Sequence, residues 1–239
     1  MISRKDLSSF FSQDIEPIVI KQIDNKDTDI WLLEKHYAKR KPSRSFSFGI
    51  FINGGLEGVV TYGVPSSPKL SERICGIEYK NQVFELNRLC LNSDVPKNSA
   101  SMLVGKSLKL LPKDLILVSY ADIGQGHTGY IYQATNWLYT GITDKSGCFS
   151  KIEVGDKVRT SKSFYDELGT QTKSVILEHY PDAVFHPYTQ KHRYIQFTGS
   201  KSQKKKFKKA LIYDIYPYPK GDNKQYDCPD IKNGRIVKK

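Results

Sequence analysis

Asp122 stands between a short apolar run and a glycine-rich turn, a setting in which a carboxylate can meet a ligand. The run Leu115-Ile116-Leu117-Val118 predicts a strand buried on both faces. In open α/β sheets the carboxyl end of such a strand is where ligands bind. Gly124, Gly126 and Gly129 give the following turn its backbone freedom. Asp122 could therefore hold or deprotonate a substrate, and equally it could cap the next helix.

A short helix and a second strand are expected after this turn. Apolar residues from Ile131 to Leu138 keep a helix-like spacing, and Trp137 to Gly141 predicts a strand. Tyr132 lies on a neighbouring stripe of the helix. Its phenol could orient Asp122 or a substrate amine, or it could be an aromatic side chain of the core.

Four other residues carry side chains that need an explanation. His36 and Tyr37 share the end of an expected helix beside a basic run, where a lone histidine is usually exposed or structural. Arg88 lies in an alternating strand, where an unpaired guanidinium is costly. It should have an anionic partner: Glu85, Asp122 or a substrate group. His127 is a second candidate ligand or base, unless it serves the turn.

The chain around these residues predicts one mixed α/β domain with a basic extension. A hairpin turn is expected at Asn53-Gly54-Gly55, and Pro42 should end the helix that carries His36. Residues 65–82 are expected to form a surface loop, and the chain beyond Gly141 a loop-rich insertion. Strands are expected at 17–23, 46–52, 56–62, 83–91 and 192–197, and further helices at 102–111, 161–168 and 174–180. We expect one domain over 1–200 and an extension over 201–239, with a basic helix, a Tyr/Pro-rich segment that packs back on the domain or is partly disordered, and disorder from residue 221.

The composition favours a polyanionic partner. The net charge is +12 and the isoelectric point is near 9.4, which suits nucleic acid, although such charge also serves solubility. A run of lysines, which could be a solvated helix face instead, occupies positions 201, 204, 205, 206, 208 and 209. The four cysteines are scattered, so neither zinc nor a disulfide framework is expected. No apolar run has the length of a signal peptide or a membrane span, so we expect a cytoplasmic protein without membrane contact.

Four separated motifs, in the same order, resemble the Mom family of bacteriophage DNA-modification proteins. They are Tyr120-Ala121-Asp122 with Gly126 to Gly129 and Ile131 to Ala134, His36-Tyr37, Asn87-Arg88-Leu89, and Asn98 to Ser101. The order strand, loop, helix, strand also resembles the core of the GNAT acyltransferase fold. The resemblance implies a GNAT-like mixed central sheet of six to seven strands flanked by helices. It also implies an enzyme that attaches a methylcarbamoyl group to the N6 amine of adenine in double-stranded phage DNA, so that host restriction enzymes fail to cut it.

The same resemblance implies cofactors and residue roles. The family is associated with acetyl-CoA and with a bound ferrous ion (Fe2+), and it acts in the cytoplasm of the bacterial host. GNAT proteins carry a glycine-rich loop where this chain has Asn98 to Ser101. Serine hydroxyl groups could therefore take the place of backbone amides in binding an anion here. The alternative is an ordinary helix capped by a serine. The implied catalytic residues are His36, Tyr37, Arg88, Asp122 and Tyr132; the iron ligands are His36, Tyr37 and Asp122; the acetyl-CoA loop is Asn98, Ser99, Ala100 and Ser101; and the DNA contacts are Lys39, Arg40, Arg44, Lys204, Lys205 and Lys206.

Two other functions stay open from the residues alone. The first is a DNA-binding module that keeps a GNAT-like shape without catalysis, with the lysine run contacting phosphates. The second is a GNAT enzyme that acylates a protein or a small molecule.

Overall fold

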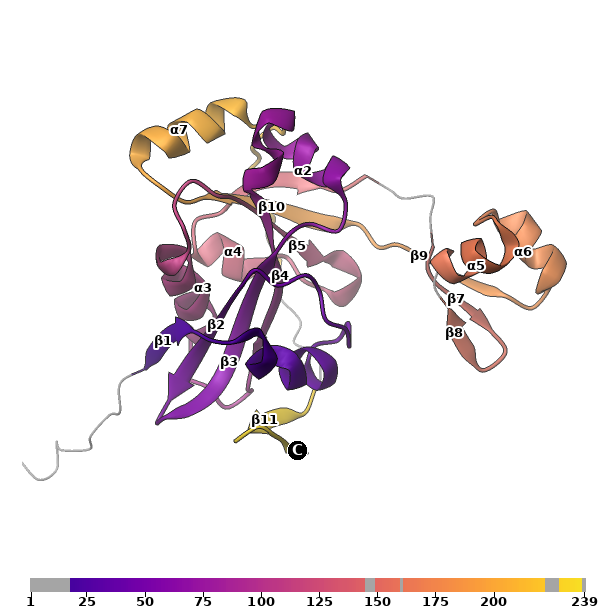
Figure 1. The fold of residues 1–239 in the computed structure, drawn as a ribbon, viewed down its shortest axis with the longest axis horizontal. Coiled ribbons are helices and arrows are strands. Elements are labelled where there is room, and N and C mark those ends of the chain that lie inside the picture. Colours follow the sequence, from indigo (N-terminus) through magenta and orange to yellow (C-terminus); the bar gives the residue numbers. More distant parts are fainter. Residues whose placement is uncertain (1–17, 145–148, 160, 222–227, 238–239) are drawn as a thin grey trace, which may run out of the picture.

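A seven-stranded mixed sheet forms the centre of the molecule (Figure 1). The computed structural model describes residues 18–144, 149–159, 161–221 and 228–237. The strand order is β1-β2-β3-β4-β5-β10-β6, in which β4 and β5 run parallel and the other neighbours run antiparallel. The strands are β1 (Val19–Gln22), β2 (Phe46–Ile52), β3 (Gly55–Gly63), β4 (Val83–Leu91), β5 (Ile116–Asp122), β6 (Leu138–Ile142) and β10 (Lys191–Phe197). The expected mixed sheet flanked by helices is confirmed.

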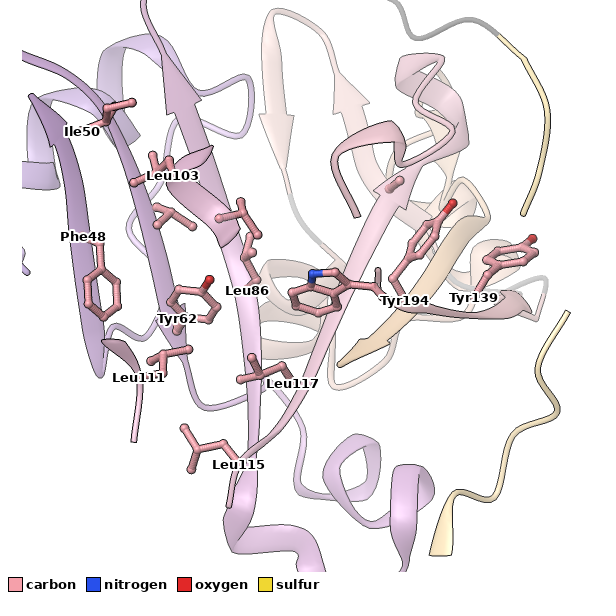
Figure 2. Packing of buried hydrophobic residues seen from close by; sticks show 14 residues of the cluster. Phe48, Ile50, Tyr62, Leu86, Leu103, Leu111, Leu115, Leu117, Tyr139 and Tyr194 are labelled. Carbon is pink, nitrogen blue, oxygen red and sulfur yellow. The ribbon is translucent and has the colours of Figure 1, made fainter. Parts of the chain in front are cut away.

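Helices cover both faces of this sheet. On one face, α3 (Ser99–Leu110) and α4 (Tyr130–Ala134) enclose the main core, to which Leu103, Phe48 and Tyr62 belong (Figure 2). On the other face, α2 (Pro68–Cys75) and α7 (Lys201–Ala210) contribute Ile74 and Phe207 to a second core. Short helical turns are η1 (Asn25–Thr28), η2 (Trp31–Lys35), η3 (Ile77–Gln82) and η4 (Ile123–Gln125). Within the described ranges no helix is long and apolar enough to cross a membrane.

Residues 65–82, expected to be a surface loop, form α2 and η3, so that expectation was wrong. Pro68 is the first residue of α2, where a proline costs nothing because that N–H has no helical partner. Ile74 and Cys75 are buried on the inner side of the helix.

The chain between β6 and β10 forms a small unit of its own. It contains β7 (Phe149–Val154), β8 (Lys157–Arg159), α5 (Ser161–Leu168), α6 (Lys173–His179) and β9 (Val184–Pro187). Ile152, Phe164 and Ile176 are fully buried in its core, and Figure 1 shows the unit standing beside the large sheet. The two short helices were expected, but the three-stranded sheet β8-β7-β9 replaces the expected loops.

The C-terminal extension packs on the domain. Beyond α7, the Tyr216 N–H donates to Tyr139 O at 2.9 Å and the Tyr218 hydroxyl to Trp137 O at 2.8 Å, along the β6 edge. Residues 228–237, expected to be disordered, form the hairpin β11 (Asp230–Lys232) and β12 (Arg235–Val237), because Ile231 is buried. Residues 1–17, 222–227 and 238–239 lie outside the described part of the chain. The division at residue 200 stays a prediction.

Candidate active site

The candidate site lies where β4 and β5 part. These strands pair over three residue pairs, the last of which joins Glu85 and Val118. Just beyond it the Ser119 hydroxyl donates to Leu86 O at 2.8 Å. Beyond this point β4 and β5 no longer pair with each other, although β5 stays paired with β10 as far as Asp122. Parallel strands that separate in this way leave backbone and side chains at their carboxyl ends to meet a ligand.

A β-bulge in β4 directs Arg88 into this site. Thr61 pairs with Arg88 and Tyr62 with Leu86, so Asn87 is the extra residue. The Asn87 side chain accepts from the Thr61 hydroxyl at 2.6 Å and donates to Ser43 O at 2.8 Å. A bulge changes the direction of the side chains that follow it. No sequence pattern distinguishes this bulge from a regular strand.

Arg88 is a buried cation for which the described residues provide no carboxylate partner. Its side chain is 9% exposed, Nη1 donates to Asn87 O at 2.6 Å, and the buried Nε has no hydrogen-bond partner among the described residues. Glu85 and Asp122 are the two protein partners that we expected for Arg88. Among the ion pairs of the described residues, neither carboxylate pairs with Arg88. Burial, and then the nearby Arg40, lower the pKa of Arg88. The guanidinium is therefore placed to receive an anionic or polar ligand.

His36 and Tyr37 follow η2 directly and lie against Arg88. The expected helix ends at Lys35, and His36 has extended backbone angles. Its ring lies 4.3 Å from the Tyr37 ring, centroid to centroid, and the Tyr37 ring lies 6.3 Å from that of His127. The sequence-predicted candidates His36, Tyr37, Arg88 and His127 thus come together.

His36 carries no charge at neutral pH. Burial, followed by the positive charges of Arg88, His127 and Arg40, lowers its pKa to about 3. Its Nδ1 accepts the Ala38 N–H at 3.1 Å, which assigns the remaining proton to Nε2. A neutral imidazole of this kind can accept or donate hydrogen bonds, but it carries no positive charge that could stabilise an anion.

The depressed pKa of His36 predicts acid sensitivity. The unfolded chain binds a proton here below pH 6.5, whereas the folded chain binds none until about pH 3. The free energy of unfolding should therefore fall as the pH drops below 6.5, by up to roughly 1.4 kcal/mol per pH unit. Urea unfolding between pH 7 and 4.5 measures this slope. The slope should become shallower in His36→Gln; an unchanged slope would show that His36 is accessible to protons in the folded chain. The His192→Gln variant is the matched control, because a smaller lowering of pKa is resolved there.

Asp122 is both a cap and a neighbour of Tyr37. Its Oδ1 accepts the Gly124 N–H at 2.9 Å and the Thr189 hydroxyl, and its Oδ2 lies 3.9 Å from Lys191 Nζ. A Cβ at position 124 would come within 2.4 Å of Thr189, so glycine is required for this packing. Burial, and then the charge of Asp122, raise the pKa of Tyr37, so its phenol stays protonated at neutral pH.

Glu85 and Lys191 complete the site; the sequence suggested Glu85 only as a partner of Arg88 and gave Lys191 no role. Burial raises the pKa of Glu85, against the opposing effect of Lys191, Arg88 and Arg40. Glu85 therefore lies within electrostatic reach of three cations while it keeps affinity for a proton. For Glu85 the signal in the sequence was its position three residues before Arg88 in the same strand. No signal in the sequence pointed to Lys191, because its position beside Asp122 depends on the pairing of β10 with β5.

Tyr132 approaches from the other face of the sheet. Burial raises its pKa to about 12, and its hydroxyl is hydrogen-bonded to Ser119. Its ring packs 5.3 Å from that of Trp137 and 5.1 Å from that of Tyr194. Tyr132 thus supports the parting of the strands through Ser119, and the structure shows no contact between its hydroxyl and Asp122.

Comparisons with known proteins identify the family of this chain. The model of the Mom protein family matches residues 17–220. The chain belongs to the Mom family. It is 29% identical over 192 residues to "Methylcarbamoylase mom" of Escherichia phage Mu, over 78% of this chain and 77% of that protein.

Several solved acetyltransferases show a loose structural similarity to this Mom family member. An N-acetyltransferase from Staphylococcus aureus Mu50 has a TM-score of 0.44 and 12% identity, over 76% of this chain and 99% of that one. An acetyltransferase from Salmonella typhimurium, solved with acetyl-CoA, has a TM-score of 0.44 and 9% identity, over 77% and 96%. At such TM-scores these likenesses decide nothing about what the present chain binds.

The expected iron ligands do not form a ready metal site. The Nδ1 of His36 is hydrogen-bonded, the Tyr37 phenol resists ionisation, and Asp122 caps η4. Within the described ranges no three His, Cys, Asp or Glu side chains gather as metal ligands would. Iron binding by His36, Tyr37 and Asp122 stays a prediction, and the chemistry proposed below does not use it.

The loop expected to bind acetyl-CoA presents backbone and not hydroxyl groups. Asn98 has a left-handed conformation (φ 69°) before α3. The Ser99 hydroxyl donates to Pro96 O at 2.7 Å and the Ser101 hydroxyl to Asn98 O at 2.9 Å. Both hydroxyl protons are thus used within the loop, so an anion here would meet the amides at the start of α3, Ala100 among them. Acetyl-CoA binding at this loop stays a prediction.

The expected DNA contacts fall on two separate surfaces. Lys39, Arg40 and Arg44 lie beside the site, and of these Lys39 donates to Glu34 O and Arg44 pairs with Asp29. Arg40 is exposed and close enough to His36 and Arg88 to affect their pKa values. Lys204, Lys205 and Lys206 lie on α7, beyond the far end of β10 (Figure 1). Seven residues of β10 at about 3.3 Å each place α7 roughly 20 Å from Asp122 along the sheet.

Proposed function

We propose that this Mom family member is a transferase that attaches a methylcarbamoyl-type group to the N6 amine of adenine in DNA. The observation that carries the proposal is the buried Arg88 guanidinium, which has no carboxylate partner in the described chain and faces the parting of β4 and β5. The 29% identity to the phage Mu methylcarbamoylase supports the class of group that is transferred.

The residues around Arg88 suit an attack by an amine on a carbonyl carbon. The adenine amine is a weak nucleophile because its lone pair is delocalised, so a base must take its proton as the new N–C bond forms. Glu85 and Asp122 are the carboxylates available, and the raised pKa of Glu85 suits it to accept this proton. Arg88 then stabilises the negative charge that develops on the carbonyl oxygen, and the leaving group departs from the same carbon. Acetyl-CoA, when bound at the start of α3, would supply an acetyl group with the coenzyme A thiolate as its leaving group, so the nitrogen of a methylcarbamoyl group would have to come from a second, nitrogen-containing donor.

The target atom must leave the double helix before it can react. The N6 amine takes part in base pairing, so the adenine has to be flipped out or met in an unpaired strand. Arg40 is the exposed cation next to the site and suits a contact with the phosphate of the flipped nucleotide.

Mass analysis of nucleosides tests the proposal against its two rivals. DNA isolated from cells that express this chain should contain a modified deoxyadenosine that is absent when Arg88 is replaced. Unmodified DNA that still binds the purified protein would favour a non-catalytic DNA-binding module. Unmodified DNA together with an acylated protein or metabolite would favour an acyltransferase with another substrate.

A salt titration distinguishes the two basic surfaces. Loss of one phosphate contact should flatten the slope of log K against log salt by about 0.9. We expect this change for Arg40→Gln. Lys204, Lys205 and Lys206, changed together to Gln, should reduce affinity equally for all sequences and spare the reaction on short oligonucleotides that do not reach α7. Parental affinity and slope in the α7 variant would restrict the DNA face to the surface around Arg40.

A further inference from the structure

The C-terminal hairpin packs on the element that carries His36 and Tyr37, although the family match ends at residue 220. β11 and β12 pair over three residues each, around a turn at Asn233-Gly234 in which both residues have positive φ. A hairpin of this size is not stable alone in water. Its order depends on Ile231, which is 1% exposed and packs with Trp31, Leu32, Val59 and Cys90.

Asn92, the residue after β4, holds the backbone of this hairpin. Its amide donates to Ile231 O and accepts the Ile231 N–H, the latter at 2.8 Å. One buried side chain thus satisfies both backbone groups of the residue that anchors β11. Lys232 adds ion pairs to Glu57 and Asp94 at 2.7 and 3.0 Å, but these are partly exposed and contribute little.

Lys35, the last residue of η2, is almost fully buried by the C-terminal segment. Its side chain is 2% exposed. Nζ donates to Asp230 Oδ1 at 2.9 Å, to Pro229 O at 2.8 Å and to Cys228 Sγ at 3.3 Å. An ammonium has three donors, and all three are used by residues of this one segment. A lysine so buried depends on its carboxylate partner.

Asp230 connects Lys35 to the loop after β4. Its carboxylate also accepts the Ser93 N–H at 3.0 Å and the Ser93 hydroxyl at 2.6 Å. Burial alone would raise the pKa of Asp230, but the hydrogen bonds from Ser93 and Lys35 outweigh it and lower the pKa to about 2. The carboxylate is therefore ionised at any pH at which the protein would be assayed.

The position of His36 and Tyr37 depends on how η2 ends. η2 is a single five-residue turn, too short to keep its shape alone. His36 follows it directly, and the His36 N–H donates back to Trp31 O at 2.9 Å. Whatever fixes Lys35 also fixes the start of the His36-Tyr37 pair.

We propose that Lys35 and Asp230 are positioning residues, through which the C-terminal hairpin clamps the end of η2 and holds the His36 and Tyr37 rings against Arg88 and His127. The expected effect on activity rests on the function proposed above. The clamp itself can be observed without any chemistry.

The test compares Lys35→Met, Asp230→Asn and the double variant with the parent protein. Each single change should lower the turnover of adenine modification at saturating DNA about tenfold or more, while the Kd for DNA stays within about twofold. Because both changes break the same pair, the double variant should be about as slow as the slower single one. Hydrogen–deuterium exchange should become faster over residues 31–37 and stay unchanged in β10, which reports that the sheet is folded. Lys35→Arg should restore part of the turnover.

Lys232→Met is the matched control, because it removes the exposed ion pairs of the same hairpin and leaves Lys35 and Asp230 in place. It should keep turnover within about twofold of the parent. Parental exchange over residues 31–37 in Asp230→Asn would show that there is no clamp. Faster exchange there with parental turnover would show that the clamp does not position the site. If the parent itself yields no modified adenine, the proposed function fails, and the exchange data alone decide whether the clamp exists.

Discussion

Replacement of Arg88 by methionine is expected to abolish adenine modification without destabilising the protein. Arg88 is buried, has no ion pair in the described chain and leaves its Nε without a partner. A methionine of similar length removes an uncompensated charge, so the free energy of unfolding should stay the same or rise by about 1 kcal/mol. Turnover should fall at least about 100-fold, because the donor that stabilises the developing negative charge is lost.

Arg193→Met provides the matched control for this result. Arg193 lies in β10, stacks on Tyr213 with its Cζ 3.4 Å from the ring centroid, and donates to Thr140 at 3.0 and 2.9 Å. Its replacement should cost stability and leave turnover close to that of the parent. Nucleoside mass analysis and urea unfolding of both variants measure the contrast. If Arg88→Met unfolds more readily than Arg193→Met and still modifies DNA, Arg88 is a structural residue.

Asp122→Asn should reduce turnover about 100-fold or more, the usual contribution of a group that handles a proton or holds the nucleophile. The asparagine oxygen can still accept the Gly124 N–H, so the cap of η4 remains, whereas the negative charge beside Tyr37 and Lys191 is lost. Asp122→Ala should lose the cap as well, and therefore both activity and some stability.

Asp94→Asn controls for the loss of a carboxylate elsewhere, since Asp94 pairs with Lys232 on the exposed side of the hairpin. Single-turnover rates with a methylcarbamoyl donor and duplex DNA would separate the variants. A parental rate in Asp122→Asn would leave Asp122 as a cap alone and Glu85 as the sole carboxylate for the reaction.

Local sequence patterns predicted the elements that are held together by interactions between residues near in sequence. The hairpin β2–β3, the alternation of β4, the buried strand β5 with Asp122 at its end, and the short helices α5 and α6 all lie close to the expected positions. Periodicity and turn residues are sufficient for such elements, because their hydrogen bonds join residues that are near in sequence.

The remaining features depend on contacts between distant residues. The sequence does not show that β10 lies between β5 and β6, and this pairing brings Lys191 to Asp122. It does not show the bulge at Asn87, which leaves no compositional trace. The expectation of a disordered tail failed for residues 228–237. The tail from residue 221 is rich in polar and charged residues, which predicts exposed chain, whereas the buried Ile231 and the Lys35–Asp230 pair order this part of it.

The short parallel pairing of β4 and β5 gives the site an order of assembly during synthesis. Strands β1 to β4, with His36 and Arg88, come from residues 19–91, whereas β5, β6 and β10, with Asp122, come from residues 116–197. Because a domain generally folds as a unit, β4 has no partner on its β5 side until the second half of the chain emerges from the ribosome. Until then Arg88 has neither Asp122 beside it nor the clamp on η2. Catalytic competence would thus arrive late, once residue 230 has left the exit tunnel and reached Lys35.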